Sequence, residues 1–291
     1  MRFSPTLANK PKSNKPRHSN EKLVDPFASP PKGLFIADLP THNLVLNKFP
    51  VIPDHFILAT KDFKEQTDLL EEDDLGAAYE CFSAYRQDGE ELFGFFNSGE
   101  HSGASQRHRH LQFLPVESMR IGIEKGQSWD VMADSLTRIP RPGMFPVRQY
   151  IAEFDSVDLP FLYFSHTVPK DASSKTLHEI YTKLHKNACQ LLHTASAGHA
   201  CTKSQPPMSY NLGLTDQVMV LCPRAAEGIK LRNTEREDIG FVALNGTVLG
   251  GTLLVKNEAE YVALRNDQSK LVEILSAIGF SPTQLEHDQK L

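Results

Sequence analysis

The chain has 291 residues, of which 40% are apolar and 23% are charged, and its formal net charge is −5. This is the composition of a globular protein with one large domain or two coupled halves, and no apolar run approaches the roughly 20 residues that a membrane span needs. The first 22 residues hold six Lys or Arg against one acidic residue, so the rest of the chain is acidic. An acidic body argues against a broad surface for duplex nucleic acid, although a small anionic ligand needs only a local cluster of donors.

The beginning of the chain predicts a basic arm without regular structure, followed by ordered chain from about Leu34. Residues 1–33 are rich in Pro, Ser, Lys and Asn, and their prolines would break the amphipathic helix of an import signal. The cysteines form no C-x-x-C pair, which is typical of free thiols in a reducing compartment: Cys81, Cys189, Cys201 and Cys222. We therefore expect a cytoplasmic or nuclear protein with neither a membrane nor a nucleic acid as partner.

The first half predicts strands around one helix. Two apolar runs joined by a Pro-containing turn, 43–49 and 55–60, predict a pair of strands. Asp73 or Asp74 is predicted to cap a helix whose apolar face has a 3.6-residue period, and Asp88-Gly89 to end it. The remaining elements expected here are a strand at 91–96, a polar loop at 97–106 and a strand at 108–115.

The second half is predicted to begin where Pro140, Pro142 and Pro146 interrupt the chain, which gives halves at 34–145 and 146–291. Its expected elements are strands at 160–164, 210–214, 218–222 and 252–256, helices at 174–193, 258–265 and 268–278, a loop at 198–207 and a C-cap at Gly279. Together the elements predict an α+β fold with a largely antiparallel sheet flanked by helices. The strand pair at 211–221 resembles that at 43–59, so the second half is a candidate degenerate repeat of the first, without paired histidines and serving as scaffold.

The chemistry is expected between Asn97 and Gln112. Side chains alternate between the two faces of a strand, so His108, His110 and Gln112 should line a cleft while the residues between them pack on a core. An imidazole can attack phosphorus and leave again, which splits one displacement into two easier ones. The adjoining loop suits phosphate, because Gly103 allows close approach of backbone N–H groups and Ser105 and Gln106 are donors to phosphoryl oxygens.

Two other interpretations of the histidine pair remain open at this stage. Two histidines at this spacing on a strand also supply metal ligands, but a metal site needs a third ligand and Gln112 is a poor one, so we expect no metal at His108 and His110. The pair could also be purely structural. His101 is predicted to be a solvent-facing loop residue rather than a catalyst.

At these residues the sequence resembles the histidine-triad superfamily, and more closely the fungal diadenosine tetraphosphate phosphorylases, also called ATP adenylyltransferases. The superfamily pattern is His-φ-His-φ-His after a glycine-containing phosphate loop, and the transferase branch has Gln in the third place, as in residues 108–112. Residues 47–61 resemble the family's paired strands that hold the nucleoside, and residues 244–256 resemble its C-terminal signature. The resemblance covers about residues 2–280 and implies a histidine-triad-like fold.

The resemblance also implies a reaction, namely phosphorolysis of diadenosine tetraphosphate to ATP and ADP, or its reverse, through a covalent nucleotidyl-histidine on His110. It implies that His108 supports the nucleophile and handles the leaving-group proton, and that Gln112 binds the phosphoryl oxygens. Asn47 would meet the ribose and Lys48 a phosphate. The residues implied to line the phosphates are Asn97, Gly103, Ala104, Ser105 and Gln106.

The implied partners are dinucleoside polyphosphates, ATP, ADP and inorganic phosphate, with Mg²⁺ or another divalent cation carried by the nucleotide rather than by a dedicated protein site. We expect a monomer. Two departures from the family stand out: Asp54 replaces a usual turn glycine, and family members usually have a segment upstream of this chain's start, whose lack would lower activity or stability. The alternatives are a hydrolase on the same fold, against which Gln112 argues, a catalytically idle nucleotide-binding protein, and a galactose-1-phosphate uridylyltransferase, which usually has a zinc-binding cysteine pair.

Overall fold

The fold is built on one large antiparallel sheet. A computed structural model of the chain describes residues 1–5, 25–123, 128–136, 159–195, 208–233, 235 and 237–281. Eight strands run in the order β2-β3-β4-β6-β5-β8-β9-β7, and every neighbouring pair is antiparallel. Their bounds are β2 Phe35–Asp38, β3 His42–Leu46, β4 Phe56–Thr60, β5 Leu92–Ser98, β6 His110–Pro115, β7 Phe164–Thr167, β8 Tyr210–Leu214 and β9 Val218–Pro223. The predicted α+β class and antiparallel sheet are therefore confirmed.

The sheet passes without a break from the first half of the chain to the second. The seam is the pairing of β5 with β8, in which Asn97 lies opposite Asn211. The two segments that suggested a repeat, β3–β4 and β8–β9, are both antiparallel hairpins of this sheet. The predicted boundary near residue 145 and the loop at 198–207 lie outside the described residues.

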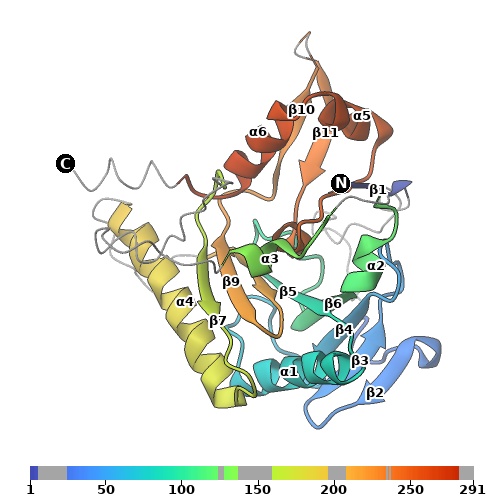
Figure 1. The fold of residues 1–291 in the computed structure, drawn as a ribbon, viewed down its shortest axis with the longest axis vertical. Helices are drawn as coiled ribbons and strands as arrows, with labels where there is room; N and C mark the ends of the chain where they lie inside the picture. The colour runs from blue at the N-terminus through green and yellow to red at the C-terminus, as the bar shows by residue number, and fades with distance from the viewer. Residues whose placement is uncertain are drawn as a thin grey trace, which may run out of the picture.

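One face of the sheet is covered by two helices, α1 (Glu72–Gln87) and α4 (Ser174–Ala195) (Figure 1). Their apolar sides close a core against side chains such as Leu58, Leu111 and Phe113, which are all fully buried. Burying one such side chain stabilises the fold by about 1.5–3 kcal/mol relative to leaving it exposed. This core therefore anchors the strand that carries the histidines from the side opposite to them.

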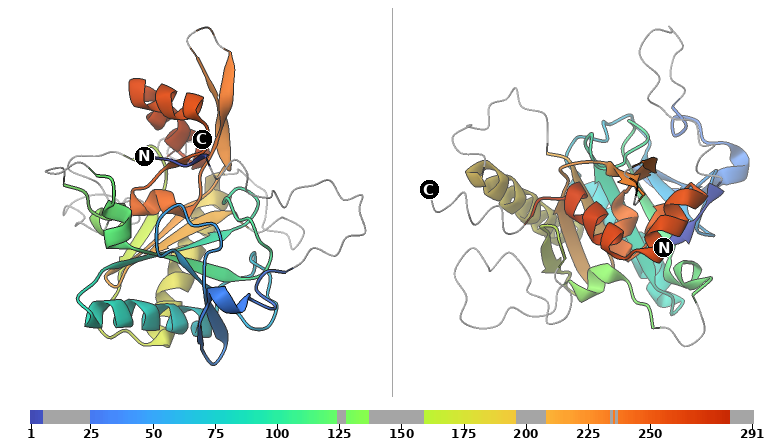
Figure 2. Two further views of the ribbon diagram at one scale, coloured as in Figure 1. Left: turned by 90° about the vertical axis from the view of Figure 1, so that its right-hand side faces the viewer. Right: turned by 90° about the horizontal axis from the view of Figure 1, so that it is seen from above.

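The other face is covered in part by short helices and by the end of the chain. The elements here are α2 Val116–Arg120, α3 Met132–Ser135, the 3-10 helix η4 Gly246–Gly250, α5 Glu258–Asn266 and α6 Ser269–Ile278. A hairpin of β10 (Gly228–Arg232) and β11 (Asp238–Ala243) projects away from the large sheet beside α5 and α6 (Figures 1 and 2). These elements form a second core with Phe93 and Phe95 of β5 and leave the β2–β3–β4 end of this face for the cavity described below.

The stretch 1–33 is not structureless throughout, as its composition predicted. β1 (Arg2–Phe3) pairs in parallel with β12 (Leu254–Val255), and residues 25–31 pack against the sheet with Phe27 buried, ahead of the 3-10 helix η2 (Lys32–Leu34). The Pro-rich composition gave the wrong result because these residues take their partners from distant segments rather than from each other. Residues 25–31 therefore pack on the sheet ahead of Leu34, where the ordered chain was expected to begin.

Several predicted element ends are also wrong. The N-cap of α1 is Glu71, and Asp74 instead accepts a hydrogen bond from the Glu71 backbone N–H at 2.7 Å. The apolar run at 160–163 precedes β7, and Leu162 donates to the Phe280 carbonyl instead of joining the sheet. The C-cap of α6 is Gly279, as predicted, but its backbone is extended (φ −118°) rather than left-handed; a Cβ there would lie 2.5 Å from the Cβ of Phe161. β2, β10 and β11 were not predicted.

Candidate active site

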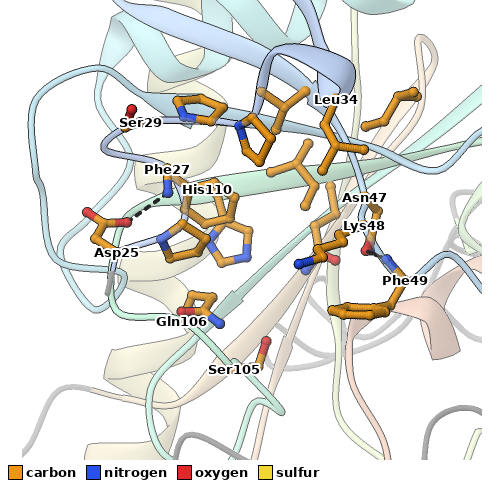
Figure 3. A pocket seen from close by; sticks show the side chains of 17 residues that line it. Asp25, Phe27, Ser29, Leu34, Asn47, Lys48, Phe49, Ser105, Gln106 and His110 are labelled. Atoms are coloured by element: carbon orange, nitrogen blue, oxygen red, sulfur yellow. Dashed lines mark hydrogen bonds between the residues drawn. The ribbon is translucent and has the colours of Figure 1, made fainter. Parts of the chain in front are cut away.

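A cavity of about 410 Å³ opens on the face of the sheet to which His110 and Gln112 point. This size is within the usual range for small-molecule sites. Figure 3 shows Ser105 and Gln106 on one wall, Ser29 and Leu34 on the opposite wall, and His110 between them. The complete lining is Asp25, Pro26, Phe27, Ser29, Pro30, Pro31, Leu34, Val45, Leu46, Asn47, Lys48, Phe49, Ile57, Ser105, Gln106, His110 and Gln112.

The cavity lining is partly polar and partly apolar. Its polar side chains include Ser105, Gln106, Gln112 and His110, and Lys48 reaches in from the turn between β3 and β4 (Figure 3). Its apolar part comes from the prolines of segment 25–31 and from aliphatic side chains of β3 and β4: Val45, Leu46 and Ile57. The structure therefore brings six of the predicted site residues together: Asn47, Lys48, Ser105, Gln106, His110 and Gln112.

His110 is held by its backbone and by one ring nitrogen. Nδ1 lies 2.8 Å from the His108 carbonyl oxygen, which can only accept, so Nδ1 carries a proton and the lone pair of a neutral ring lies on Nε2. The side chain of Gln66 accepts from the His110 N–H at 2.8 Å and donates to the carbonyls of His110 and Asn97 at 3.2 and 2.8 Å. Gln66 was missed because its partners are backbone groups, which leave no side-chain pattern in the sequence.

His108 does not line the cavity, contrary to the prediction. β6 begins at His110, and His108 forms an isolated bridge with Glu65. Its ring is 2% exposed; Nδ1 lies 2.6 Å from the Asp25 carboxylate and Nε2 lies 2.9 Å from the Thr60 hydroxyl. Both ring nitrogens therefore have partners inside the protein, and neither faces the cavity as a proton donor for a leaving group would.

Asn97, Gly103 and Ala104 also lie behind the cavity wall rather than on it. Asn97 is the penultimate residue of β5, and its Oδ1 accepts from Asn211 Nδ2 and from the Gly246 N–H, both at 2.8 Å. Gly103 has φ +77°, and a Cβ there would lie 2.8 Å from the Leu244 carbonyl oxygen. These three residues therefore do not line the cavity, and Asn97 and Gly103 instead lie against the C-terminal half.

The comparisons with known proteins cover both halves of the chain. The profile of the Ap4A phosphorylase N-terminal domain matches residues 1–125, and that of the ATP adenylyltransferase C-terminal domain matches residues 157–281. Diadenosine 5',5'''-P1,P4-tetraphosphate phosphorylase 2 of Saccharomyces cerevisiae is 30% identical over 296 residues, which cover 97% of this chain and 83% of the yeast protein. The chain belongs to the Ap4A phosphorylase family.

Other similar proteins agree with this family. Protein APA1 of the same yeast is 29% identical over 290 residues, covering 96% of this chain and 82% of its own. The crystal structure of yeast Ap4A phosphorylase Apa2 has a TM-score of 0.71 and 24% identity, covering 96% of this chain and 84% of that one. The structure of Apa2 in complex with Ap4A gives a TM-score of 0.69 at 25% identity, with the same coverage.

A buried arginine in the second half of this family member supports the loop from behind. The Arg224 side chain donates to Asn211 Oδ1, and Asn211 Nδ2 donates to the Ser102 carbonyl in the loop at 2.8 Å. Arg224 also donates to the Leu244 and Ile278 carbonyls at 3.0 and 3.1 Å. The second half of the chain therefore contacts the loop at 97–106 through Asn211, which Arg224 holds in place.

A second buried cation, Arg109, lies between the two histidines on the opposite face, where the superfamily pattern has an apolar residue. Arg109 is 2% exposed and donates to Asp74 at 2.9 Å and to Glu71 at 3.0 Å, and His42 lies 2.9 Å from the same Asp74 carboxylate. Burial acts to raise the pKa of Asp74, but hydrogen bonds from His42 and the Glu71 backbone, with the charge of Arg109, outweigh it and lower that pKa. The ionised Asp74 thus balances the positive charge of Arg109 at a position of the motif that is usually apolar.

Asp54, where the family usually has glycine, adopts the left-handed conformation that glycine would provide, with φ +58°. Aspartate tolerates this region better than most residues, and its carboxylate accepts from the Ser118 hydroxyl of α2 at 3.0 Å. Asp54 therefore supplies a left-handed residue in the turn between β3 and β4.

No metal cluster is apparent near the histidines. In the part of the chain that the structure describes, no three His, Cys, Asp or Glu side chains are placed to hold a metal ion. Within the same residues, no helix is both long enough and apolar enough to cross a membrane.

Proposed function

We propose that this chain transfers an adenylyl group through His110, phosphorolysing diadenosine tetraphosphate to ATP and ADP and catalysing the reverse reaction. The observation that carries the proposal is the orientation of His110. Its Nδ1–H donates a hydrogen bond to the His108 carbonyl, so a nucleophilic lone pair lies on Nε2 in a ring that borders the cavity. The membership in the Ap4A phosphorylase family and the yeast relative named above support the choice of substrate.

The cavity suits one nucleotide of the substrate. The base would lie against the prolines of 25–31 and the aliphatic residues of β3 and β4, and the α-phosphate would lie beside His110. Asn47 lines the cavity while its side chain binds the Phe49 N–H at 2.9 Å and His55 at 3.0 Å, which fixes it for a ribose contact. Ser105, Gln106 and Gln112 would bind the phosphoryl oxygens, and Lys48 would offset their charge.

The reaction would then proceed in two displacements. Nε2 of His110 attacks the phosphorus next to one adenosine, a P–N bond forms, the P–O bond to the bridging oxygen breaks, and ATP leaves. An oxygen of inorganic phosphate next attacks the same phosphorus, the P–N bond breaks, and ADP leaves with His110 restored. Mg²⁺ or another divalent cation would enter on the tetraphosphate, and we propose that the protein acts as a monomer.

The decisive test is product analysis with diadenosine tetraphosphate, with and without phosphate. Phosphate-dependent ATP and ADP support the proposal, AMP and ATP without phosphate indicate the hydrolase, and tight binding without turnover indicates an idle nucleotide-binding protein. Intact-protein mass in the absence of phosphate should show one added adenylyl group, which a phosphate chase removes as ADP. His110→Asn should abolish this adduct and lower turnover by several orders of magnitude, whereas His166→Asn on the remote strand β7 should not.

A further inference from the structure

We propose that Asp25 is a positioning residue for the nucleophile and acts by holding His108 as an imidazolium; this rests on the proposed function of His110. Asp25 comes from the proline-rich segment ahead of the sheet, and its Oδ2 lies 2.6 Å from Nδ1 of His108. Its Oδ1 accepts from the Phe27 N–H at 2.9 Å. One carboxylate therefore joins the cavity wall to the histidine that precedes the nucleophile.

The hydrogen bonds around His108 determine its protonation. An ionised carboxylate only accepts, so Nδ1 of His108 carries a proton toward Asp25. The Thr60 hydroxyl has one proton and donates it to the Asp62 carbonyl at 2.8 Å, so it accepts from Nε2 of His108 at 2.9 Å. Both nitrogens are thus donors, which makes the ring an imidazolium whose charge is matched by Asp25.

The other groups packed around His108 do not replace this carboxylate. The rings of Phe27 and Phe63 lie edge-on to it, with centroids 5.8 and 5.4 Å away. Glu65, which bridges to His108 through the backbone, has its own carboxylate paired with Arg107. His110 is a further titratable group near His108, and the Phe27 ring contacts its ring as well, at 5.0 Å.

The contacts form a chain from Asp25 to the reacting atom. Asp25 and Thr60 hold the His108 ring from both sides, and the ring in turn holds the backbone of His108. The carbonyl of that backbone accepts the hydrogen bond from Nδ1–H of His110. Asp25 therefore acts on Nε2 of His110 without touching the reacting phosphorus. The imidazolium also cancels the negative charge of Asp25 at a wall of a cavity that is proposed to admit a polyphosphate.

The same geometry assigns no proton transfer to His108. Both of its N–H groups are occupied by Asp25 and Thr60, and the ring lies behind the cavity wall. The leaving group in the proposed reaction is the terminal phosphate of ATP, a stable anion that can depart without a proton.

The test combines a direct measurement of protonation with kinetics of the full-length protein. Long-range proton–nitrogen NMR spectra of the imidazoles at neutral pH should show two protonated nitrogens for His108, assigned by their loss in His108→Gln. Asp25→Asn keeps an acceptor for the Phe27 N–H but removes the charge, so His108 should keep only one proton. Asp38→Asn, the same change at an exposed carboxylate of β2, is the control and should alter neither signal.

Kinetics then separate positioning from folding. Asp25→Asn should lower kcat by about 10²-fold, the effect of a misplaced reacting group, with KM changed less than about 3-fold. A merely structural role would lower thermal stability and raise KM but leave kcat in place.

The outcomes remain distinguishable from those of the proposed function. A single protonated nitrogen on His108 in the unaltered protein, or an Asp25→Asn variant with unchanged kcat, would overturn the role of Asp25. If the unaltered protein does not turn over diadenosine tetraphosphate, the proposed function fails, whereas the NMR measurement still decides the protonation of His108.

Discussion

Replacing Arg224 by methionine should cost both stability and activity, although this residue is far in sequence from the histidines. The guanidinium is 2% exposed, and burial lowers its pKa to about 10, so it stays protonated at neutral pH. It donates to Asn211 and to four backbone carbonyls, and no carboxylate is among these hydrogen-bond partners. Methionine fills much of the side-chain volume but supplies no donor.

The magnitude follows from the acceptors that lose their partner. The Leu244 carbonyl and Asn211 Oδ1 are buried, and each costs about 1–3 kcal/mol when left unsatisfied. The Ile278 carbonyl keeps the backbone N–H of Ala225 as a donor, and the two other carbonyls are at partly buried positions, where water can replace the guanidinium. We therefore expect a loss of about 2–6 kcal/mol, a large part of the roughly 5–15 kcal/mol that stabilises a typical domain.

Urea unfolding at pH 7 measures this loss, with Arg232→Met on the exposed face of β10 as the control. A double-mutant cycle sharpens the test, because Asn211→Leu removes one orphaned acceptor and the double variant should lose less than the sum of the single variants. In conditions where Arg224→Met stays folded, kcat should also fall, since Asn211 no longer holds the Ser102 carbonyl. A loss below about 1 kcal/mol, or strict additivity with Asn211→Leu, would refute this reasoning.

Three further changes test other parts of the structure. Asp74→Asn should lower the free energy of unfolding by about 3–5 kcal/mol at pH 7, because it breaks the buried pair with Arg109. Folding lowers the pKa of Asp74, so the ionised carboxylate stabilises the fold above about pH 4. The difference in urea stability between the variant and the unaltered protein must therefore shrink as pH falls below that value. Asp54→Gly should change the free energy of unfolding by less than about 1 kcal/mol, because glycine adopts the left-handed conformation without the steric cost of a Cβ, which offsets the lost hydrogen bond to Ser118. A loss of more than about 2 kcal/mol would contradict this. Gln112→Ala should slow adduct formation by about 10²–10³-fold in quenched-flow mass measurements, and an unchanged rate would remove it from the phosphoryl site.

The parts of the site that follow local periodicity could be predicted from the sequence. Alternation along one strand placed His110 and Gln112 on the cavity face and Leu111 on the core face, and the structure confirms both. The same rule failed for His108, because the strand begins at His110 and the histidine before it is enclosed by Asp25. The alternation of side chains applies within a strand, and it cannot show that a distant segment packs over the residues just before that strand begins.

The residues that were missed have partners far away in the chain. Gln66 binds backbone groups of two strands, and Asp25 lies in a proline-rich stretch whose composition indicated an arm. Arg224 is a single basic residue whose burial depends on carbonyls from three later segments. A sequence pattern records the period of one element, whereas these contacts depend on how distant elements meet.

The seam between β5 and β8 also has a consequence for synthesis on the ribosome. The cavity-lining residues end at Gln112, whereas Asn211, Arg224 and the 3-10 helix beginning at Gly246 emerge roughly a hundred or more residues later. At about 5–20 residues per second, that interval is on the order of 5–25 s. Throughout it the edge of β5 lacks its partner strand, so the nascent first half presents an open hydrogen-bonding edge of the kind that chaperones shield and that other chains can join.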